Sequence, residues 1–345
     1  MINVGVLAPS EIAFRRFMPA LSAIENAHFV GVGVYSAEER FGQNNYSDNY
    51  IFSKIKDENI KANKFTNDYG GRVFHSFQEL IESPDIDAVY LPLPPAAHAF
   101  WAKKVLESGK HLLMEKPFTT RVADTEELLT LAKKSNLAVH ENYMFVYHKQ
   151  IKEIKRIIDN KELGKIRLFR ITFGFPMRAK DDFRYDKSQG GGSLIDAGGY
   201  TIKFAQCLLG PDVKVQASKL NFENSFDVDL FGSATLIGKS GITAQLSFGM
   251  DNEYRNELEV WGSNGLLISD RVLTAPPGFY PKATLRKQGV DTAIKLSEDD
   301  AFKKSIESFF EAIEDENVRN AKYTEIMNQA TLVDTAFSIG DTSFK

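Results

Sequence analysis

Short apolar runs alternate with helix-like stretches over the first 145 residues. The apolar runs lie at 2–8, 28–35, 87–94, 111–117 and 137–143, and helical periodicity is found at 12–24, 37–42, 76–82, 96–108 and 123–135. Continuous runs of this kind are typical of a parallel sheet covered by helices on both faces, although buried helices would explain some of them. The polar stretch 42–71 is expected to be an extended loop or a helical insertion.

The pattern changes after about residue 145. A helix is expected at 148–159, and alternating strands are expected near 165–176, 213–222, 228–237, 242–250 and 256–262. Closing helices are expected near 300–314 and 322–339. Alternation such as ITAQLSF at 242–248 places one face of a sheet on a core and the other on solvent or a partner. This second sheet could therefore pair with another subunit.

Length, composition and charge narrow the function classes. The 345 residues suit two domains with a cleft between them, and 43% hydrophobic and 26% charged residues are typical of a globular protein. A net charge of −4 argues against a nucleic-acid or membrane partner and favours a small molecule. The single cysteine, Cys207, allows no intramolecular disulfide, and no leader or spanning segment is recognisable, so a cytoplasmic location is expected.

The first strand-to-helix turn reads APSEIA at 8–13, where a dinucleotide site usually has G-x-G-x-x-G or A. Both early glycines are replaced. Ser10 can hydrogen-bond a phosphate and Ala13 keeps helix and strand close, but Glu11 must point outward if a pyrophosphate binds here. The turn alone is compatible with a dinucleotide site or with a purely structural role.

The end of the second strand bears on the choice of cofactor. Tyr35 and Ser36 stand where a carboxylate would bind a ribose 2′-OH. Without that carboxylate, a 2′-phosphate could be accepted by Ser36 together with Arg15, Arg16 or Arg40, which favours NADP over NAD. Each arginine, taken singly, is equally well explained as a solvated helix charge.

Lys116 follows a strand at the carboxyl edge of the predicted parallel sheet, within Glu115-Lys116-Pro117. Ligands of open α/β folds bind at this edge. A partly buried ammonium there can exchange a proton with a hydroxyl or carbonyl group. A cis bond at Pro117 would fix the direction of the lysine. The structural alternative is a strand-end lysine that reaches solvent.

A second cluster reads GGGSLIDAGGY at 190–200 and leads into an apolar helix. Asp196 and Tyr200 are four residues apart and would share one helix face. A carboxylate and a phenol side by side could bind sugar hydroxyls and relay a proton. Alternatively, Asp196 is a helix N-cap and Tyr200 a core aromatic.

Together these motifs resemble the Gfo/Idh/MocA oxidoreductases, the family of glucose-fructose oxidoreductase and inositol dehydrogenase. The resemblance covers nearly the whole chain and rests on 90–118, ENYMFVYH at 141–148, 183–200 and WGSNGLL at 261–267. It implies a Rossmann domain at 1–122 and a substrate-binding and dimerisation domain at 123–345, whose open, mixed, largely antiparallel sheet would join a homodimer or homotetramer. The closing helices could pack back on the first domain.

The resemblance also implies roles for individual residues. Lys116, Asp196 and Tyr200 would be catalytic, with Tyr200 as proton donor or acceptor. The positions expected to line NADP or NAD are Ala8, Ser10, Glu11, Ile12, Tyr35, Ser36, Arg40, Pro92, Leu93, Pro94, His98, Glu115 and Lys116. The positions expected to bind substrate are Asn142, Tyr143, Arg184, Asp196 and Tyr200. His98 is as well explained by helix capping, and no metal is expected.

The predicted function is reversible hydride transfer between NAD(P) and a carbon of a sugar, nucleotide-linked sugar or cyclitol. Lys116 and Tyr200 would handle the proton while the nicotinamide carries the hydride. Two alternatives stay open: a redox-assisted glycoside hydrolase with tightly bound NAD, and a non-catalytic dinucleotide- or sugar-binding protein, which the altered first turn would favour.

Overall fold

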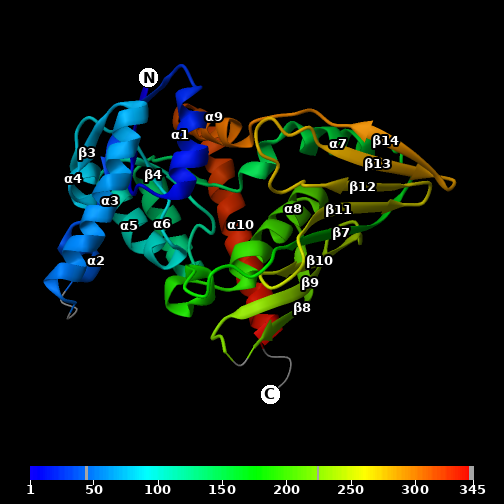
Figure 1. The fold of residues 1–345 in the computed structure, drawn as a ribbon. Coiled ribbons are helices and arrows are strands. Elements are labelled where there is room, and N and C mark those ends of the chain that lie inside the picture. Colours follow the sequence, from blue (N-terminus) through cyan, green and yellow to red (C-terminus); the bar gives the residue numbers. More distant parts are fainter. Residues whose placement is uncertain (43–45, 224, 342–345) are drawn as a thin grey trace. The chain divides into compact units, whose positions relative to one another are not determined.

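The computed structural model describes residues 1–42, 46–223 and 225–341 (Figure 1). The chain forms two compact units. The first contains Met1–Phe118, Ala123–Asn142 and Ser305–Thr324, and the second contains Thr119–Val122, Tyr143–Lys304 and the chain from Glu325 onward. Each unit is built around its own sheet.

The first unit is built on a parallel sheet, which we call the first sheet. Its strand order is β3-β2-β1-β4-β5-β6. The strands are β1 (Ile2–Val6), β2 (Ala27–Gly33), β3 (Arg72–Phe74), β4 (Ala88–Leu91), β5 (His111–Met114) and β6 (Val139–Glu141). Every residue of β4 is buried, as expected of a central strand covered on both faces. The predicted parallel α/β arrangement is confirmed.

Helices connect these strands. They are the π-helical turn η1 (Ala13–Phe17), α1 (Met18–Ser22), α2 (Ala37–Phe41), α3 (Asp48–Tyr69), α4 (Phe77–Glu82), α5 (Pro95–Glu107) and α6 (Val122–Lys134). The helical alternative for 42–71 is correct over Asp48–Tyr69, and α3 packs on β2 and β3 (Figure 1). Its buried residues Ala62 and Phe65 are three apart, so they lie on one face of the helix.

The second unit is built on a mixed, mostly antiparallel sheet, which we call the second sheet. Its strand order is β14-β13-β12-β11-β7-β10-β9-β8, and only the β7–β10 pair is parallel among the described strands. The strands are β7 (Ile166–Gly174), β8 (Lys214–Phe222), β9 (Asp229–Ile237), β10 (Thr243–Gly249), β11 (Arg255–Gly262), β12 (Leu266–Asp270), β13 (Lys282–Lys287) and β14 (Val290–Lys295). This confirms the predicted fold class.

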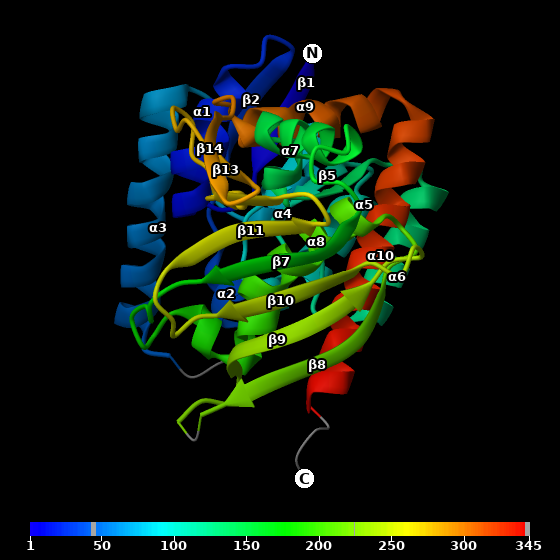
Figure 2. The same cartoon turned by 90° about the vertical axis from the view of Figure 1, so that its right-hand side faces the viewer.

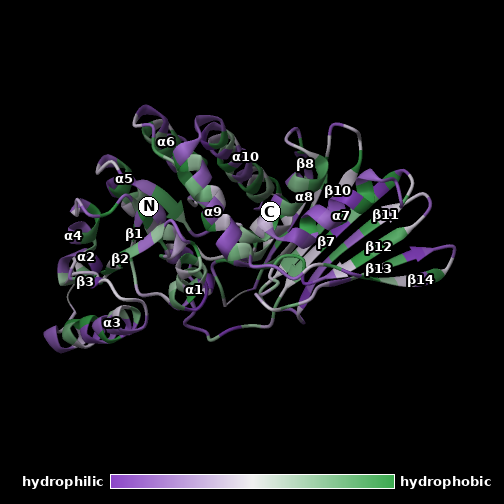
Figure 3. Ribbon diagram, turned by 90° about the horizontal axis from the view of Figure 1, so that it is seen from above, coloured by the Kyte–Doolittle hydropathy of each residue, from purple (hydrophilic) through white to green (hydrophobic). Residues whose placement is uncertain are grey.

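One face of the second sheet carries the core of its unit. Leu246 of β10, Leu258 of β11 and Phe204 of α8 (Gly199–Leu209) belong to one buried cluster. The opposite face bears exposed aromatic side chains, including Phe231 and Trp261. Figure 2 looks onto this sheet, and Figure 3 shows hydrophilic and hydrophobic residues alternating along its strands. The period-two pattern predicted from the sequence is therefore present.

The remaining helical segments include the two closing helices. They are η2 (Met144–Tyr147), α7 (Lys149–Asp159), η3 (Phe183–Tyr185), η4 (Lys187–Gln189), η5 (Leu194–Gly198), α9 (Ala301–Glu314) and α10 (Glu316–Asp341). Both α9 and α10 divide between the units, since residues 305–324 belong to the first. Over the described parts of the chain, none of the helices has the length and apolar content needed to cross a membrane.

Candidate active site

The turn after β1 holds Ser10 in a local network. The Ser10 backbone N–H donates to the Ala8 carbonyl at 2.8 Å, and Ser10 Oγ accepts from the Ala13 backbone N–H at 3.2 Å. A serine that accepts in this way can still donate its own proton, as a phosphate oxygen would require. Glu11 is exposed and pairs with Arg15 at 2.7 Å, so it satisfies the condition of pointing outward. Ile12 is also exposed.

At the end of β2, Ser36 begins α2 through a capping box. Ser36 Oγ accepts from the Glu39 backbone N–H at 3.3 Å, and the Ser36 N–H donates to Glu39 Oε2 at 2.8 Å. The same carboxylate accepts from the backbone N–H groups of Phe77 (3.0 Å) and Gln78 (2.9 Å) at the start of α4. Glu39 therefore caps two helices. The S-x-x-E spacing signals such a cap, but the sequence interpretation did not use it.

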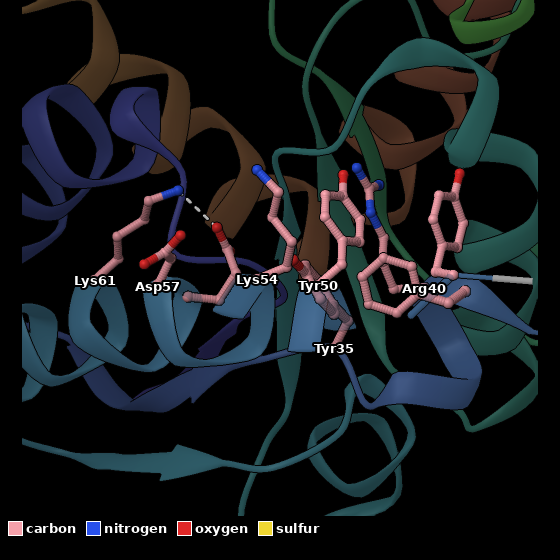
Figure 4. Close-up of a pocket in the computed structure, with 9 residues that line it drawn as sticks. Tyr35, Arg40, Tyr50, Lys54, Asp57 and Lys61 are labelled. Carbon is pink, nitrogen blue, oxygen red and sulfur yellow. Dashed lines mark hydrogen bonds and ion pairs between the residues drawn. The ribbon is translucent and has the colours of Figure 1, made fainter. Parts of the chain in front are cut away.

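A pocket of about 360 Å³ opens beside this strand end (Figure 4). Its lining residues are Tyr35, Arg40, Phe41, Tyr46, Tyr50, Lys54, Asp57, Glu58 and Lys61. The Arg40 guanidinium lies over the Tyr35 ring at 5.4 Å, and the Lys54 ammonium lies over the Tyr50 ring at 5.5 Å. Burial, followed by the charge of Glu58, raises the pKa of Tyr35. The pocket thus combines aromatic walls with two cations that contact ring faces.

The segments after β4 and β5 are tied together by His98. This fully buried side chain has Nδ1 at 2.7 Å from the Pro117 carbonyl and Nε2 at 2.8 Å from the Leu93 carbonyl. Burial lowers the pKa of His98, whereas the two carbonyls, each of which needs an N–H donor, act in the opposite direction. His98 therefore links the segment Pro92-Leu93-Pro94 to the turn that contains Lys116. Among the described residues, no side chain, that of His98 included, forms a capping hydrogen bond at Pro94, where α5 begins.

Glu115 and Lys116 follow β5, and the Lys116-Pro117 bond is cis, as considered from the sequence. Glu115 Oε1 accepts hydrogen bonds from the Tyr90 hydroxyl and from Asn142 Nδ2, both at 2.7 Å. Removal of the carboxyl group from water raises the pKa of Glu115, although these two bonds and the charge of Lys116 act in the opposite direction. Burial therefore favours the neutral form of Glu115, while its hydrogen bonds and the charge of Lys116 favour the ionised form.

In the second unit, Arg184 and Asp196 form a direct ion pair. Arg184 Nε donates to Asp196 Oδ2 at 2.7 Å, and Arg184 Nη1 donates to Asp182 at 3.0 Å. Burial alone would lower the pKa of Arg184, but the charges and hydrogen bonds of Asp196 and Asp182 outweigh it and raise the pKa. Asp196 lies inside η5, so the N-cap alternative is wrong. Asp182 was not recognised from the sequence, because nothing in its spacing distinguishes it from a loop acid.

Tyr200 belongs to an aromatic cluster in the second unit. Its ring centroid lies 5.2 Å from Tyr143 and 5.3 Å from Phe173, and its hydroxyl points to Met144 Sδ at 4.0 Å. The ring is 8% exposed, so the core-aromatic interpretation describes its packing correctly. Tyr200 nevertheless lies four residues after Asp196, in the helix that directly follows η5. Packing of the ring would hold the phenol group, as a proton donor, in one orientation.

The glycine-rich turn before Asp196 is fixed by Asp229. Asp229 Oδ2 accepts from Ser193 Oγ at 2.5 Å and from the Leu194 backbone N–H at 2.8 Å. Burial raises the pKa of Asp229. Gly192 has φ +124°, and a side chain there would meet Asp229 at 2.6 Å. Glycine is therefore required by conformation and by space, and Asp229 is a supporting residue that sequence reasoning missed.

The predicted residues fall into one group in each unit. In the first unit, the predicted residues follow the carboxyl ends of four neighbouring parallel strands. They are Ala8 after β1, Tyr35 after β2, Pro92 after β4 and Glu115 after β5, with their neighbours. In the second, Arg184 and Asp196 touch. The unit boundary passes between Asn142 and Tyr143. Assignment of Lys116 to the same reaction centre as Asp196 and Tyr200 stays a prediction. Across the described ranges, no group of three His, Cys, Asp or Glu side chains could hold a metal ion.

Comparison with known proteins assigns the family. Residues 26–143 match the oxidoreductase family with an NAD-binding Rossmann fold, and 151–268 match the GFO/IDH/MocA C-terminal domain. The dTDP-3,4-didehydro-2,6-dideoxy-alpha-D-glucose 3-reductases of Actinomadura kijaniata and Saccharopolyspora spinosa are 34% and 33% identical. Each alignment covers 96% of this chain, and 94% and 96% of the respective relatives.

Solved structures agree. A 3-ketoreductase from Actinomadura kijaniata, in complex with NADP and TDP-benzene, has a TM-score of 0.87 at 34% identity, over 98% of this chain and 97% of that one. An aldose-aldose oxidoreductase from Caulobacter crescentus, at 20% identity and a TM-score of 0.79 over 97% of both chains, shares the fold. The prediction of an NAD(P)-dependent oxidoreductase is confirmed. The chain belongs to the Gfo/Idh/MocA oxidoreductase family.

Proposed function

We propose that this chain is an NADPH-dependent ketoreductase that reduces the C3 keto group of a dTDP-linked deoxyhexose. The observation that carries this proposal is the similarity, over 96% of the chain, to relatives named as 3-reductases of a dTDP-linked dideoxy sugar. The structure related at 34% identity was solved with NADP and a TDP derivative, which supports the same cofactor and nucleotide class.

The proposed proton chemistry uses the predicted catalytic residues. Bound NADPH supplies the hydride. Tyr200 donates a proton to the carbonyl oxygen as it becomes a hydroxyl, and the Lys116 ammonium stabilises the negative charge that develops on that oxygen. Asp196 is held by Arg184 at 2.7 Å and accepts a hydrogen bond from a sugar hydroxyl. The ion pair keeps this acceptor in one orientation, which favours a single binding pose.

The end of β2 supports NADPH over NADH. The Glu39 carboxylate is bound by three backbone N–H groups, and Arg40 and Lys54 both line the adjoining pocket. We propose that these two cations contact the 2′-phosphate, whose charge they would neutralise. Asp57 and Glu58 also line the pocket, and Glu58 is paired with Lys61 at 2.6 Å. The remaining predicted cofactor-lining positions, from Ala8 to His98, stay part of this proposal.

The proposal extends to the assembly of the chain and to the roles of its two domains. The exposed face of the second sheet, with Phe231 and Trp261, suits contact with a second copy of the chain in a homodimer or homotetramer. Residues 1–122 would bind the dinucleotide, and residues 123–345 would bind substrate and form this contact. A cytoplasmic location is proposed with them, on the grounds of the single cysteine.

The test is turnover of a dTDP-linked 3-keto-deoxyhexose, generated enzymatically, with NADPH or NADH. We expect stoichiometric NADPH oxidation and a product with a new C3 hydroxyl, identified by mass spectrometry and NMR. Release of free sugar without net NADPH loss would instead support the redox-assisted hydrolase. Tight binding of NADPH and TDP without turnover of any 3-keto sugar would support the non-catalytic binder.

A further inference from the structure

A line of buried hydrogen bonds runs toward the Glu115 carboxylate within the first unit. His140 Nε2 lies 2.9 Å from Ser305 Oγ, Ser305 Oγ donates to Asn142 Oδ1 at 2.8 Å, and Asn142 Nδ2 donates to Glu115 Oε1 at 2.7 Å. His140 comes from β6, Asn142 directly follows it, and Ser305 comes from α9, 163 residues further along the chain. Residues remote in sequence thus meet at one carboxylate.

The chemistry of each group fixes the direction of this chain. A serine hydroxyl has one proton, so Ser305, which donates it to Asn142 Oδ1, must accept from His140. His140 therefore carries a proton on Nε2. The Asn142 amide cannot rotate without losing both bonds, because its oxygen faces a donor and its nitrogen faces the carboxylate. The Glu115 carboxylate, which only accepts, therefore selects the nitrogen end of the amide, and Ser305 anchors its oxygen end.

The environment of the chain is dry. His140 and Ser305 are fully buried and Asn142 is 1% exposed, and the Phe309 ring lies 6.0 Å from the His140 ring. An unpaired polar group in such a place is unfavourable, so each donor and acceptor has a strong preference for its partner. The groups that face the Glu115 carboxylate are the Tyr90 hydroxyl, the Asn142 amide and the charge of Lys116.

We propose that His140 and Ser305 are positioning residues for the reaction: they fix the Asn142 amide, which holds the Glu115 carboxylate beside Lys116. This inference rests on the proposed role of Lys116. The charge of Lys116 lowers the pKa of Glu115, so the two groups interact. Without the Ser305 hydroxyl, the amide oxygen loses its donor, so the amide is anchored at one end only and can shift relative to the carboxylate.

The test begins with Ser305→Ala, which removes one hydroxyl and leaves no new group. We expect kcat to fall roughly tenfold, because a displaced charge weakens catalysis without blocking substrate. KM for the 3-keto sugar and the dissociation constant of NADPH should stay within about twofold. The acidic limb of the kcat profile should move to higher pH, because weakening the Asn142 hydrogen bond removes an interaction that lowers the pKa of Glu115. His140→Phe should reproduce both effects.

Two further variants separate positioning from packing. Ser305→Thr keeps the hydroxyl and should restore most of kcat and the original pH profile. Ser269→Ala removes another buried serine hydroxyl, which donates to the Lys282 carbonyl at 3.3 Å, and should lower the melting temperature without moving the profile. If Ser305→Ala behaves like Ser269→Ala, the inference is overturned.

The inference and the proposed function fail differently. If Lys116→Ala retains full turnover, the role of Lys116 is wrong and the chain positions nothing catalytic. If Lys116→Ala is inactive while Ser305→Ala and His140→Phe keep the kcat and pH profile of the unaltered protein, only the positioning role is wrong. A pH shift in both positioning variants, restored in Ser305→Thr, supports the inference.

Discussion

Two carboxylates, one in each unit, are held in opposite ways. Glu115 in the first unit accepts from two neutral donors, Tyr90 and Asn142, and burial raises its pKa. Asp196 in the second unit is paired with the guanidinium of Arg184. Arginine stays charged at any working pH, so Asp196 has a permanent partner, whereas the charge of Glu115 depends on neutral donors and on Lys116.

The difference suggests different tasks. A carboxylate clamped by arginine offers a fixed acceptor, which suits the binding of a sugar hydroxyl. A carboxylate balanced between burial and hydrogen bonding responds to small changes nearby, which suits the support of a proton-handling amine. Glu39 is a third case: three backbone N–H groups bind it, so it serves the fold. Replacing the partners of each carboxylate one at a time tests this difference.

The largest effect is expected from Lys116→Ala, which removes the charge beside Glu115. We expect kcat to fall about a thousandfold, since general acid–base and charge stabilisation are lost together. NADPH affinity, measured by fluorescence titration, should change less than about twofold. Lys103→Ala is the matched control, because that lysine is exposed and pairs with the exposed Glu127 at 2.7 Å. Unchanged turnover in Lys116→Ala would remove the catalytic assignment.

The next effect is expected from Arg184→Ala, which leaves Asp196 and Asp182 without their shared cation. The free energy of unfolding should fall by about 3 kcal/mol, because a largely buried charge loses its partner. The kcat/KM for the sugar should fall about a hundredfold. Arg184→Lys should recover part of the stability but not the forked geometry. Urea denaturation and steady-state kinetics measure the two effects, and a stable variant with normal kcat/KM would refute the role of the pair.

Glu115→Gln should separate the charge of Glu115 from its hydrogen bonds. The glutamine oxygen can still accept from Tyr90 and Asn142. In the folded state the Glu115 pKa is raised above its ordinary value of 4.5, so the folded protein binds this proton more strongly than the unfolded chain. The wild type therefore loses stability as the pH rises from 4.5 through the folded-state pKa, and is not penalised below that window.

The variant has no proton to lose there. Its free energy of unfolding, relative to that of the unaltered protein, should increase as the pH rises across this window, while kcat falls about tenfold because Lys116 loses a charged neighbour. Denaturation at a series of pH values, with kinetics at each, tests this. A stability difference that does not change with pH would show that Glu115 is ionised equally in both states.

The sequence predicted the first unit better than the second. Continuous apolar strands and intervening helices have strong periodic signals, and each of those predicted elements is present. The strands β12, β13 and β14 were not predicted. β14 has almost no buried position, and the hairpin turn before it uses Gln288 and Gly289 at positive φ, a weaker signal than Asn-Gly. The three-residue β3 is too short for any period to be visible.

Motifs likewise indicate candidate residues that lie on them, but not the residues that support them. Lys116, Asp196 and Tyr200 stand in short, distinctive segments. Asp229 supports Leu194 from 35 positions away, and Ser305 supports Asn142 from 163 positions away. Such pairs leave no local pattern, because only the folded chain brings them together. A single sequence therefore shows where chemistry is concentrated more readily than what holds it in place.

The smallest effect is expected at the third carboxylate, where Glu39 is already bound by backbone N–H groups. A 2′-phosphate beside it would meet Arg40 and Lys54. Because Lys54 is exposed, its interaction with a phosphate should contribute about 1 kcal/mol, so Lys54→Gln should raise KM for NADPH roughly fivefold. KM for NADH should not change, and added salt should shrink the difference. Lys56→Gln is the control on the same helix, outside the pocket lining. Equal changes for NADPH and NADH would show that the 2′-phosphate does not contact Lys54.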